Sequence, residues 1–270
     1  MTGRARTRAL AAALTILLVH PSFAQRTAET TLPLKHYHGF GGGFVLYDRN
    51  ADRYTVFRPN ECTRRLTPAS TFKILNSLIG LESGVIPDEH YVIRWDSVHR
   101  DVESWNRDHD LASAIANSVV WYYQELARRV GRARMTAYID TTGYGNNDAS
   151  GPIDRFWLES TLLISAQEQV AFLRRLYDGT LPFSKRSIDI VKKILVLERT
   201  DTHVLRGKTG FAEDRSGVAV GWFVGYVEKP GNVYFFALNM TSRNMERDGA
   251  AIFRERKTAA LAILHDLGVL

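Results

Sequence analysis

Strand-type segments at both ends of the chain enclose a long helical middle, and this arrangement constrains the fold more than any other feature of the sequence. Near the beginning, residues 44–47 and 54–57 are rich in aromatic and branched side chains and are separated by turn-forming residues. Near the end, residues 217–228 and 233–241 have the same character and flank a Lys-Pro-Gly-Asn turn. Each end therefore predicts a β-hairpin, and we expect both hairpins to join one antiparallel sheet.

Helical periodicity occupies the middle of the chain. Ser165 and Glu168 have the spacing of a capping box and predict a helix start. The same periodicity returns over 248–267 and predicts a C-terminal helix. Apolar residues recur at spacings of three and four in three central segments, 72–81, 111–130 and 167–177.

These elements predict an α+β protein in which an antiparallel sheet is flanked by helices and carries an inserted all-α lobe, as in a β-lactamase/transpeptidase-like fold. We assign residues 25–65 and 199–270 to the sheet lobe and residues 66–198 to the helical lobe. Residues 25–38 are expected to form an irregular arm. A chain of 270 residues is long enough for one domain made of two packed lobes.

Residues 1–24 have the composition of a secretory signal peptide. Three arginines precede an apolar stretch at 9–19, and the small-residue sequence Ser-Phe-Ala ends at Ala24. The stretch is shorter than the roughly 20 residues that span a bilayer, and Pro21 follows it. We expect cleavage after Ala24 and a secreted, periplasmic mature chain with no membrane contact; the alternative is an uncleaved anchor.

Charge and metal-ligand residue types argue against several classes of protein. Removing residues 1–24 takes away three arginines and no acid, so the formal net charge falls from +6 to +3, and no basic cluster with interleaved aromatic residues indicates a nucleic-acid partner. Cys62 is the single cysteine, which excludes an intramolecular disulfide and predicts a structural thiol. His36 and His38 form an H-x-H pair, but no helical i, i+4 histidine pair occurs, so we expect no metal site.

A serine and a lysine stand together at the start of the first long helix. Ser70 lies in its first turn, and Lys73 follows one turn later on the same face. Backbone N–H groups at a helix start have no partner within the helix and suit an oxyanion. The pair alone is weak evidence, because serine commonly begins helices and lysine is common within them.

Four further motifs follow along the chain: S-V-V at 118–120, Y-G-N at 144–146, F-W-L-E at 156–159 and K-T-G at 208–210. The motifs S-x-x-K, S-D-N and K-T-G are the set of the serine β-lactamases and penicillin-binding proteins. Here the middle motif is S-V-V. That departure, with the Y-G-N and F-W-L-E motifs, makes most of the mature chain resemble the class D, oxacillinase-type β-lactamases.

The resemblance implies a penicillin-recognising fold and an acyl-enzyme mechanism in which Ser70 attacks the lactam carbonyl. It also implies that carbon dioxide carboxylates the Lys73 amine, that this N-carboxylysine is the general base, and that the Trp157 indole N–H binds it. Apolar and aromatic residues surround Lys73 in the motifs, and burial lowers the pKa of a lysine amine, which leaves it neutral and able to attack carbon dioxide. Carbon dioxide or bicarbonate is the only expected cofactor.

The resemblance also assigns the other site residues. Ser118 relays a proton to the departing lactam nitrogen, and Lys208 supplies positive potential to that relay. The backbone N–H groups of Ser70 and Phe211 bind the oxyanion, and Arg254 binds the substrate carboxylate. The expected substrate contacts are Val120, Thr209, Gly210, Phe211 and Arg254.

Two related activities remain open beside the hydrolysis of penicillins. A penicillin-binding protein would be acylated and act on peptidoglycan, but S-V-V and Trp157 argue against it. A β-lactam sensor domain would be acylated without turnover. Such sensors are attached to membrane-spanning segments, which we do not find in this sequence. The substrate range and the choice between a monomer and a homodimer are left open.

Overall fold

A seven-stranded sheet joins the two ends of the chain. The computed structural model describes residues 27–158 and 161–270, so the signal peptide expected over 1–24 lies outside the described residues. The strand order is β1-β3-β2-β7-β6-β5-β4, and the pairing of β2 with β7, for example Val45 with Ala237, connects the early hairpin to the late one. The strands are β1 (Thr27–Glu29), β2 (Phe44–Asp48), β3 (Arg53–Phe57), β4 (Val196–Arg199), β5 (Val204–Glu213), β6 (Ala219–Lys229) and β7 (Asn232–Ser242).

The sheet is mixed rather than wholly antiparallel, because β1 pairs parallel to β3. The expectation of an irregular arm over 25–38 is therefore wrong in part: β1 and the 3₁₀ helix η2 (Leu32–Tyr37) lie within it. Three strand residues are too few for an alternating pattern to be read from the sequence. The α+β class with an early and a late hairpin is confirmed.

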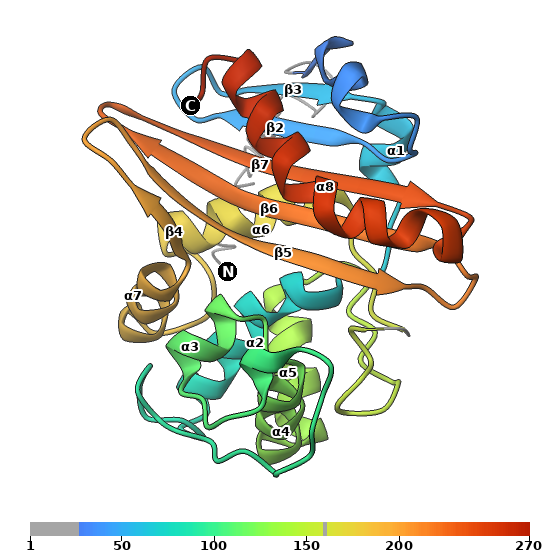
Figure 1. Cartoon of the computed structure of the whole chain (residues 1–270). Coiled ribbons are helices and arrows are strands. Elements are labelled where there is room, and N and C mark those ends of the chain that lie inside the picture. Colours follow the sequence, from blue (N-terminus) through green and yellow to red (C-terminus); the bar gives the residue numbers. More distant parts are fainter. Residues whose placement is uncertain (1–26, 159–160) are drawn as a thin grey trace, which may run out of the picture.

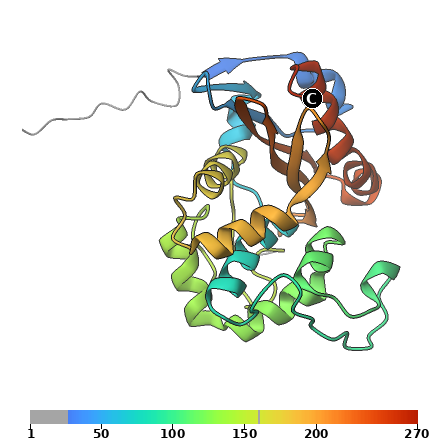
Figure 2. The ribbon, with the colours of Figure 1, turned by 90° about the vertical axis from the view of Figure 1, so that its left-hand side faces the viewer.

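Helices cover both faces of the sheet. Helix α8 (Met245–Asp266) packs on one face and α6 (Ala166–Asp178) on the other, as Figures 1 and 2 show. Alternate residues of β2 point to opposite faces, so Phe44 packs in the core under α8 and Val45 in the core under α6. The capping box of Ser165 and Glu168 is confirmed at the start of α6.

The helical lobe lies beside the edge of the sheet formed by β5 and β4 (Figure 1). The expected single helix over 111–130 is wrong, because the backbone turns at Ser118, whose φ of 53° is left-handed, between α3 and α4. Strand β4 begins at Val196, three residues before the expected start of the second sheet segment. The remaining helices are α1 (Pro59–Thr63), α2 (Lys73–Glu82), α3 (Leu111–Ala116), α4 (Val120–Val130), α5 (Arg132–Thr142) and α7 (Lys185–Ile194).

The described residues carry neither a long apolar helix nor a cluster of metal ligands. Over 27–158 and 161–270, no helix has the length and apolar character needed to cross a bilayer, and no group of three or more His, Cys, Asp or Glu side chains could hold a metal ion. The imidazole of His36 binds Asp266 at 2.7 Å. Cys62 is buried against the carbonyl oxygens of Phe44 and Phe57, and burial raises the pKa of its thiol to about 12.

Candidate active site

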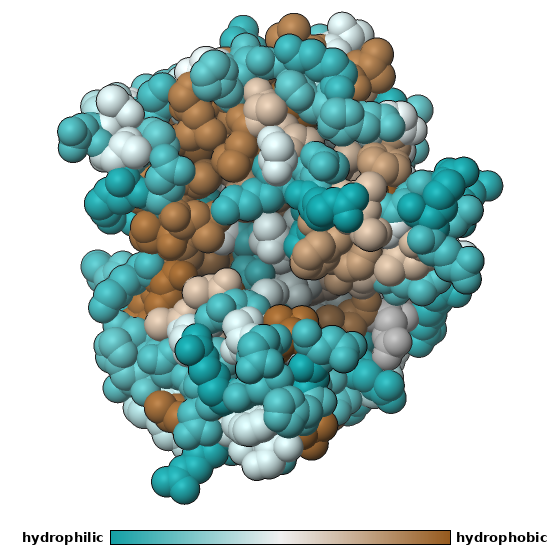
Figure 3. All heavy atoms as spheres, in the orientation of Figure 1, coloured by the Kyte–Doolittle hydropathy of each residue, from teal (hydrophilic) through white to brown (hydrophobic). Residues whose placement is uncertain are grey.

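A cleft of about 410 Å³ separates β5 from the helical lobe, and a hollow between the two halves of the molecule is visible in Figure 3. The cleft brings together six residues that the sequence selected from distant positions: Ser70, Ser118, Val120, Thr209, Gly210 and Phe211. Its other lining residues are Val102, Trp105, Ala116, Asn117, Phe253 and Arg256. None of the described lining residues is an acid.

A larger cavity of about 610 Å³ lies elsewhere, between the N-terminal arm and the start of α8. It contains the ion pairs Arg64–Glu61 and Arg247–Asp248 and none of the residues that the sequence motifs selected. The chemistry of the motifs is therefore located in the smaller cleft.

Ser70 occupies a sharp turn that leads into α2. It lies in the 3₁₀ helix η3 (Ala69–Phe72), and its side chain is almost buried, with 8% of the residue exposed. Ala69 has a left-handed φ of 48°, a conformation that costs an L-residue roughly 1–2 kcal/mol. Such strain persists only where surrounding contacts hold it.

Three side-chain hydrogen bonds hold this turn. The Thr71 hydroxyl donates to the Pro68 carbonyl at 2.7 Å and accepts from the Gln169 amide of α6 at 2.7 Å. The Trp222 indole of β6 donates to the Thr67 carbonyl at 2.8 Å. Because these partners belong to α6 and β6, the sheet and its covering helix fix the position of Ser70.

Gly210 lets the strand approach the turn closely. A Cβ atom there would lie 3.0 Å from the Pro68 carbonyl oxygen and 3.2 Å from both Thr71 Cγ2 and Trp222 Cβ. The first contact is with backbone, which cannot easily move. A larger residue in place of the K-T-G glycine would therefore crowd the packing of η3 on β5.

The backbone N–H of Phe211 faces away from β6. Gly207 donates its N–H to Leu195 on the other side of β5, and N–H direction alternates along a strand whose register with β6 is unbroken from Val204 to Glu213. The N–H groups of Thr209 and Phe211 therefore point to the same side as that of Gly207. Phe211 and Ser70 line one cleft, as an oxyanion site needs.

Lys73 is fully buried beneath the cleft. Its Nζ donates to the Ser118 carbonyl at 2.6 Å and to Ser118 Oγ at 3.1 Å, and it lies 5.4 Å from the centre of the Tyr123 ring. Burial, and secondarily the charge of Lys208, hold the pKa of the Lys73 amine well below its ordinary range. Both effects shift Lys73 toward its neutral amine.

Ser118 stands between two lysine amines. Lys208 Nζ donates to Ser118 Oγ at 2.9 Å, so this oxygen accepts hydrogen bonds from both lysine amines. Burial and the nearby charge of Arg256 lower the pKa of Lys208 to about 7. Near neutral pH, Lys208 can therefore give or take a proton at Ser118.

The indole N–H of Trp157 is buried and has no hydrogen-bond partner among residues 27–158 and 161–270. Its ring is fully buried and stacks on Phe72, with centroids 5.3 Å apart and an interplanar angle of 28°. Phe72, on which the indole stacks, directly precedes Lys73 in the chain.

The structure places Arg256, rather than Arg254, in the cleft. Arg254 is exposed on α8, whereas Arg256 is 8% exposed, lines the cleft and lies 4.0 Å from the centre of the Phe253 ring. The selection of Arg254 is therefore corrected. Ile252, Arg256 and Ala260 are spaced by four and share the buried helix face, a periodicity in the sequence that places Arg256, and not Arg254, on that face.

The fold and the cleft together are of the penicillin-recognising kind. Residues 42–260 match the family described as penicillin binding protein transpeptidase domain. The chain belongs within it to the class D β-lactamases, which hydrolyse β-lactams, and most of the chain is similar to members of that class.

Three of these relatives show the extent of the similarity. A probable β-lactamase, YbxI of Bacillus subtilis, is 46% identical over 74% of each chain, and the β-lactamase OXA-48 of Klebsiella pneumoniae is 43% identical over 82% of this chain and 83% of its own. The crystal structure of the class D β-lactamase YbXI from Nostoc has a TM-score of 0.81 at 42% identity and covers 88% of this chain and 99% of its own. The regulatory protein BlaR1 of Bacillus licheniformis is 38% identical over 84% of this chain but only 37% of its own length.

Replacing Arg256 with glutamine is expected to raise the pKa of Lys208 from about 7, because one like charge no longer opposes the ammonium while the burial of Lys208 remains. A ¹³Cε NMR titration of lysine-labelled protein measures this pKa, and Lys208→Met assigns the resonance. Arg254→Gln removes an exposed charge from the same helix and serves as the control. Equal Lys208 pKa values in Arg256→Gln and the wild type would contradict the electrostatic coupling.

Proposed function

We propose that the protein hydrolyses penicillins through an acyl-enzyme on Ser70. The observation that carries the proposal is the Ser118 hydroxyl, which lies 3.1 Å from Lys73 Nζ and 2.9 Å from Lys208 Nζ in the cleft that Ser70 lines. A chain of amine, hydroxyl and amine can carry a proton from a nucleophile to a leaving nitrogen.

In the proposed acylation, the Ser70 oxygen attacks the lactam carbonyl carbon while its proton moves toward the Lys73 side chain. The lactam C–N bond breaks, and its nitrogen takes a proton from Ser118, which Lys208 replaces. The N–H groups of Ser70 and Phe211 stabilise the negative charge on the carbonyl oxygen. The near-neutral pKa of Lys208, caused by burial and by Arg256, suits this exchange at neutral pH.

N-carboxylation of Lys73 by carbon dioxide is part of the proposal; the carboxylate supplies the general base that activates the deacylating water. Two features of this chain support it. The lowered pKa of Lys73 favours the neutral amine, which is the form that reacts with carbon dioxide. The indole N–H of Trp157 has no partner in the described part of the chain, and a buried donor without a partner costs about 1–3 kcal/mol; an anionic oxygen would satisfy it.

Arg256 takes the role of carboxylate anchor that the sequence assigned to Arg254. Burial lowers its pKa to about 10, so it remains charged at neutral pH, and its Nε has no hydrogen-bond partner among the described residues. A guanidinium can bind a carboxylate through two parallel hydrogen bonds. Val120, Phe211 and Phe253 provide apolar walls for the rest of a penicillin.

Secretion to the periplasm is also proposed, and its support is the signal-peptide pattern of residues 1–24. β-Lactams that enter the periplasm would meet the enzyme there. The proposal includes no nucleic-acid or membrane partner.

A covalent β-lactam sensor is the second candidate, and the similarity to BlaR1 favours it. Both candidates form an acyl-enzyme on Ser70, but only a β-lactamase releases it quickly. Steady-state hydrolysis of nitrocefin or benzylpenicillin by residues 25–270 separates them, because a sensor would give one equivalent of product per protein and then stop.

Ser70→Ala is expected to lower penicillin turnover by several orders of magnitude, since it removes the nucleophile. The change deletes one oxygen from a nearly buried side chain, so circular dichroism and the melting temperature should stay close to those of the wild type. Mass spectrometry should detect acylation of the wild type and none of the variant. Hydrolysis near the wild-type rate would exclude Ser70 as the nucleophile.

Trp157→Phe is expected to make activity depend on added bicarbonate, because the ring is kept while the N–H proposed to bind the carboxylate is lost. In the wild type, acidification protonates the Lys73 amine and should lower activity, and bicarbonate should restore part of it. Carbon-13 NMR with labelled bicarbonate should show a carbamate resonance that Lys73→Ala eliminates and Trp157→Phe weakens. Trp95→Phe removes an indole N–H that binds the Val98 carbonyl and is the control; a wild type with no such resonance and no response to bicarbonate would contradict N-carboxylation.

Arg256→Ala is expected to raise KM for benzylpenicillin by about tenfold or more and to lower kcat less, because a carboxylate anchor binds the ground state and the transition state alike. Arg254→Ala is the matched control on the exposed face of α8 and should leave KM within about twofold. If Arg254→Ala raised KM and Arg256→Ala did not, the original assignment of Arg254 would be restored.

A further inference from the structure

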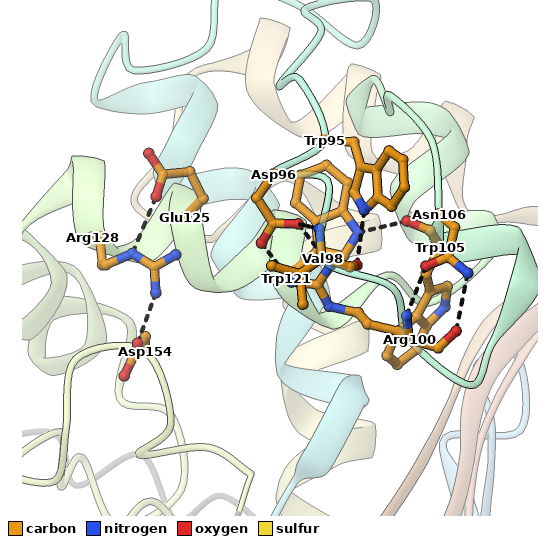
Figure 4. Close-up of polar contacts among 10 residues, drawn as sticks. All are labelled: Trp95, Asp96, Val98, Arg100, Trp105, Asn106, Trp121, Glu125, Arg128 and Asp154. Carbon is orange, nitrogen blue, oxygen red and sulfur yellow. Dashed lines mark hydrogen bonds and ion pairs between the residues drawn. The ribbon is translucent and has the colours of Figure 1, made fainter.

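The loop between α2 and α3 is held by its own hydrogen bonds and an ion pair, and it reaches the cleft. Arg100 donates to both carboxylate oxygens of Asp96, at 2.8 and 2.6 Å, and its guanidinium lies 5.7 Å from the centre of the Trp121 ring on α4. Arg100 and Asn106 exchange two further hydrogen bonds between backbone and side-chain amide, at 2.9 and 3.0 Å. These contacts, drawn in Figure 4, fix the segment that carries Trp105.

Trp105 ties this loop to the residue before Ser118. Its indole Nε1 donates to the Asn117 carbonyl at 2.9 Å, and its own carbonyl accepts from the Trp121 indole at 2.8 Å. One face of Trp105 lines the cleft. Trp121 and the loop contacts therefore fix Trp105, and Trp105 in turn fixes the Asn117 peptide.

The bond to Asn117 matters because Ser118 is strained. Its φ of 53° is left-handed, and a non-glycine residue keeps that conformation only where its surroundings impose it. The peptide carbonyl before Ser118 accepts from Trp105, and the carbonyl after it accepts from Lys73 at 2.6 Å. Both peptide groups that define the Ser118 backbone are thus held by side chains.

Trp105 and Lys73 differ in whether their hydrogen bonds to these two carbonyls can last through the reaction. Lys73 Nζ now serves both the carbonyl and the hydroxyl of Ser118. An N-carboxylated lysine has a single hydrogen on that nitrogen and cannot donate to both at once. In the described part of the chain, the Trp105 indole N–H binds only the Asn117 carbonyl. Its hydrogen bond therefore persists when Lys73 becomes N-carboxylated.

We propose that Trp105 is a positioning residue for Ser118, whose indole N–H holds the Asn117 carbonyl and thereby keeps the Ser118 hydroxyl between Lys73 and Lys208. The inference rests on the proposed role of Ser118 in the proton relay. It differs from a role of Trp105 as a wall of the cleft, because the wall needs only the ring and the positioning needs the N–H.

Trp105→Phe tests the distinction, since it keeps an aromatic wall and removes the donor. The single-turnover acylation rate with nitrocefin is expected to fall about 10- to 100-fold, as small misplacement of a reacting group does, with KM within about twofold of the wild type. The ¹³Cε resonance of Lys208 should shift, because Ser118 Oγ leaves its amine. Trp95→Phe, which removes an indole N–H from the same loop, should change neither quantity.

A double-mutant cycle with Ser118→Ala decides whether Trp105 acts through Ser118. If it does, Trp105→Phe adds less than about twofold to the defect of Ser118→Ala, while matched melting temperatures establish that the variants are folded. A fully additive defect, an unshifted Lys208 resonance or a wild-type acylation rate in Trp105→Phe would overturn the inference. Full activity of Ser118→Ala would instead overturn the proposed relay itself, so the two failures are distinguishable.

Discussion

The burial of two lysine amines around one serine hydroxyl is the constraint on which the rest of the structure depends. Removing an ammonium from water is costly, and no described acid lines the cleft to offset it, so burial lowers the pKa of both lysines. The fold can keep the two amines buried because the three residues lie on separate elements: Lys73 on α2, Ser118 at the α3–α4 junction and Lys208 on β5. Those elements are in turn fixed by the packing of the helical lobe against the sheet.

Much of this arrangement could be predicted from local patterns. Alternation and turn residues revealed both hairpins, and a capping box located the start of α6, because these signals depend only on neighbours in the chain. The motif residues around Ser70, Ser118 and Lys208 do converge in one cleft or directly beneath it. The break at Ser118 was missed, since its left-handed backbone is held in part by Trp105 and Lys73, which lie outside the α3–α4 segment.

Arg254 illustrates a different kind of failure. The resemblance assigned the carboxylate anchor to Arg254, which the structure places on the exposed face of α8. Helical periodicity distinguishes Arg254 from Arg256, because Arg256 shares a face with Ile252 and Arg254 lies two residues out of phase. The lack of a partner for the Trp157 indole among the described residues had no such signal, since hydrogen-bond satisfaction is a property of the folded chain alone.

The three basic groups of the site, Lys73, Lys208 and Arg256, are coupled to one another. Arg256 lowers the pKa of Lys208, and Lys208 lowers that of Lys73, in each case after the larger effect of burial. An anion bound at Arg256 would offset its charge and so raise the proton affinity of Lys208, and by linkage a protonated Lys208 would bind that anion more tightly. On the proposed function, a substrate carboxylate would thereby load the proton that Ser118 delivers to the lactam nitrogen. The same carboxylate would reduce the electrostatic repulsion among these basic groups, which destabilises the empty cleft.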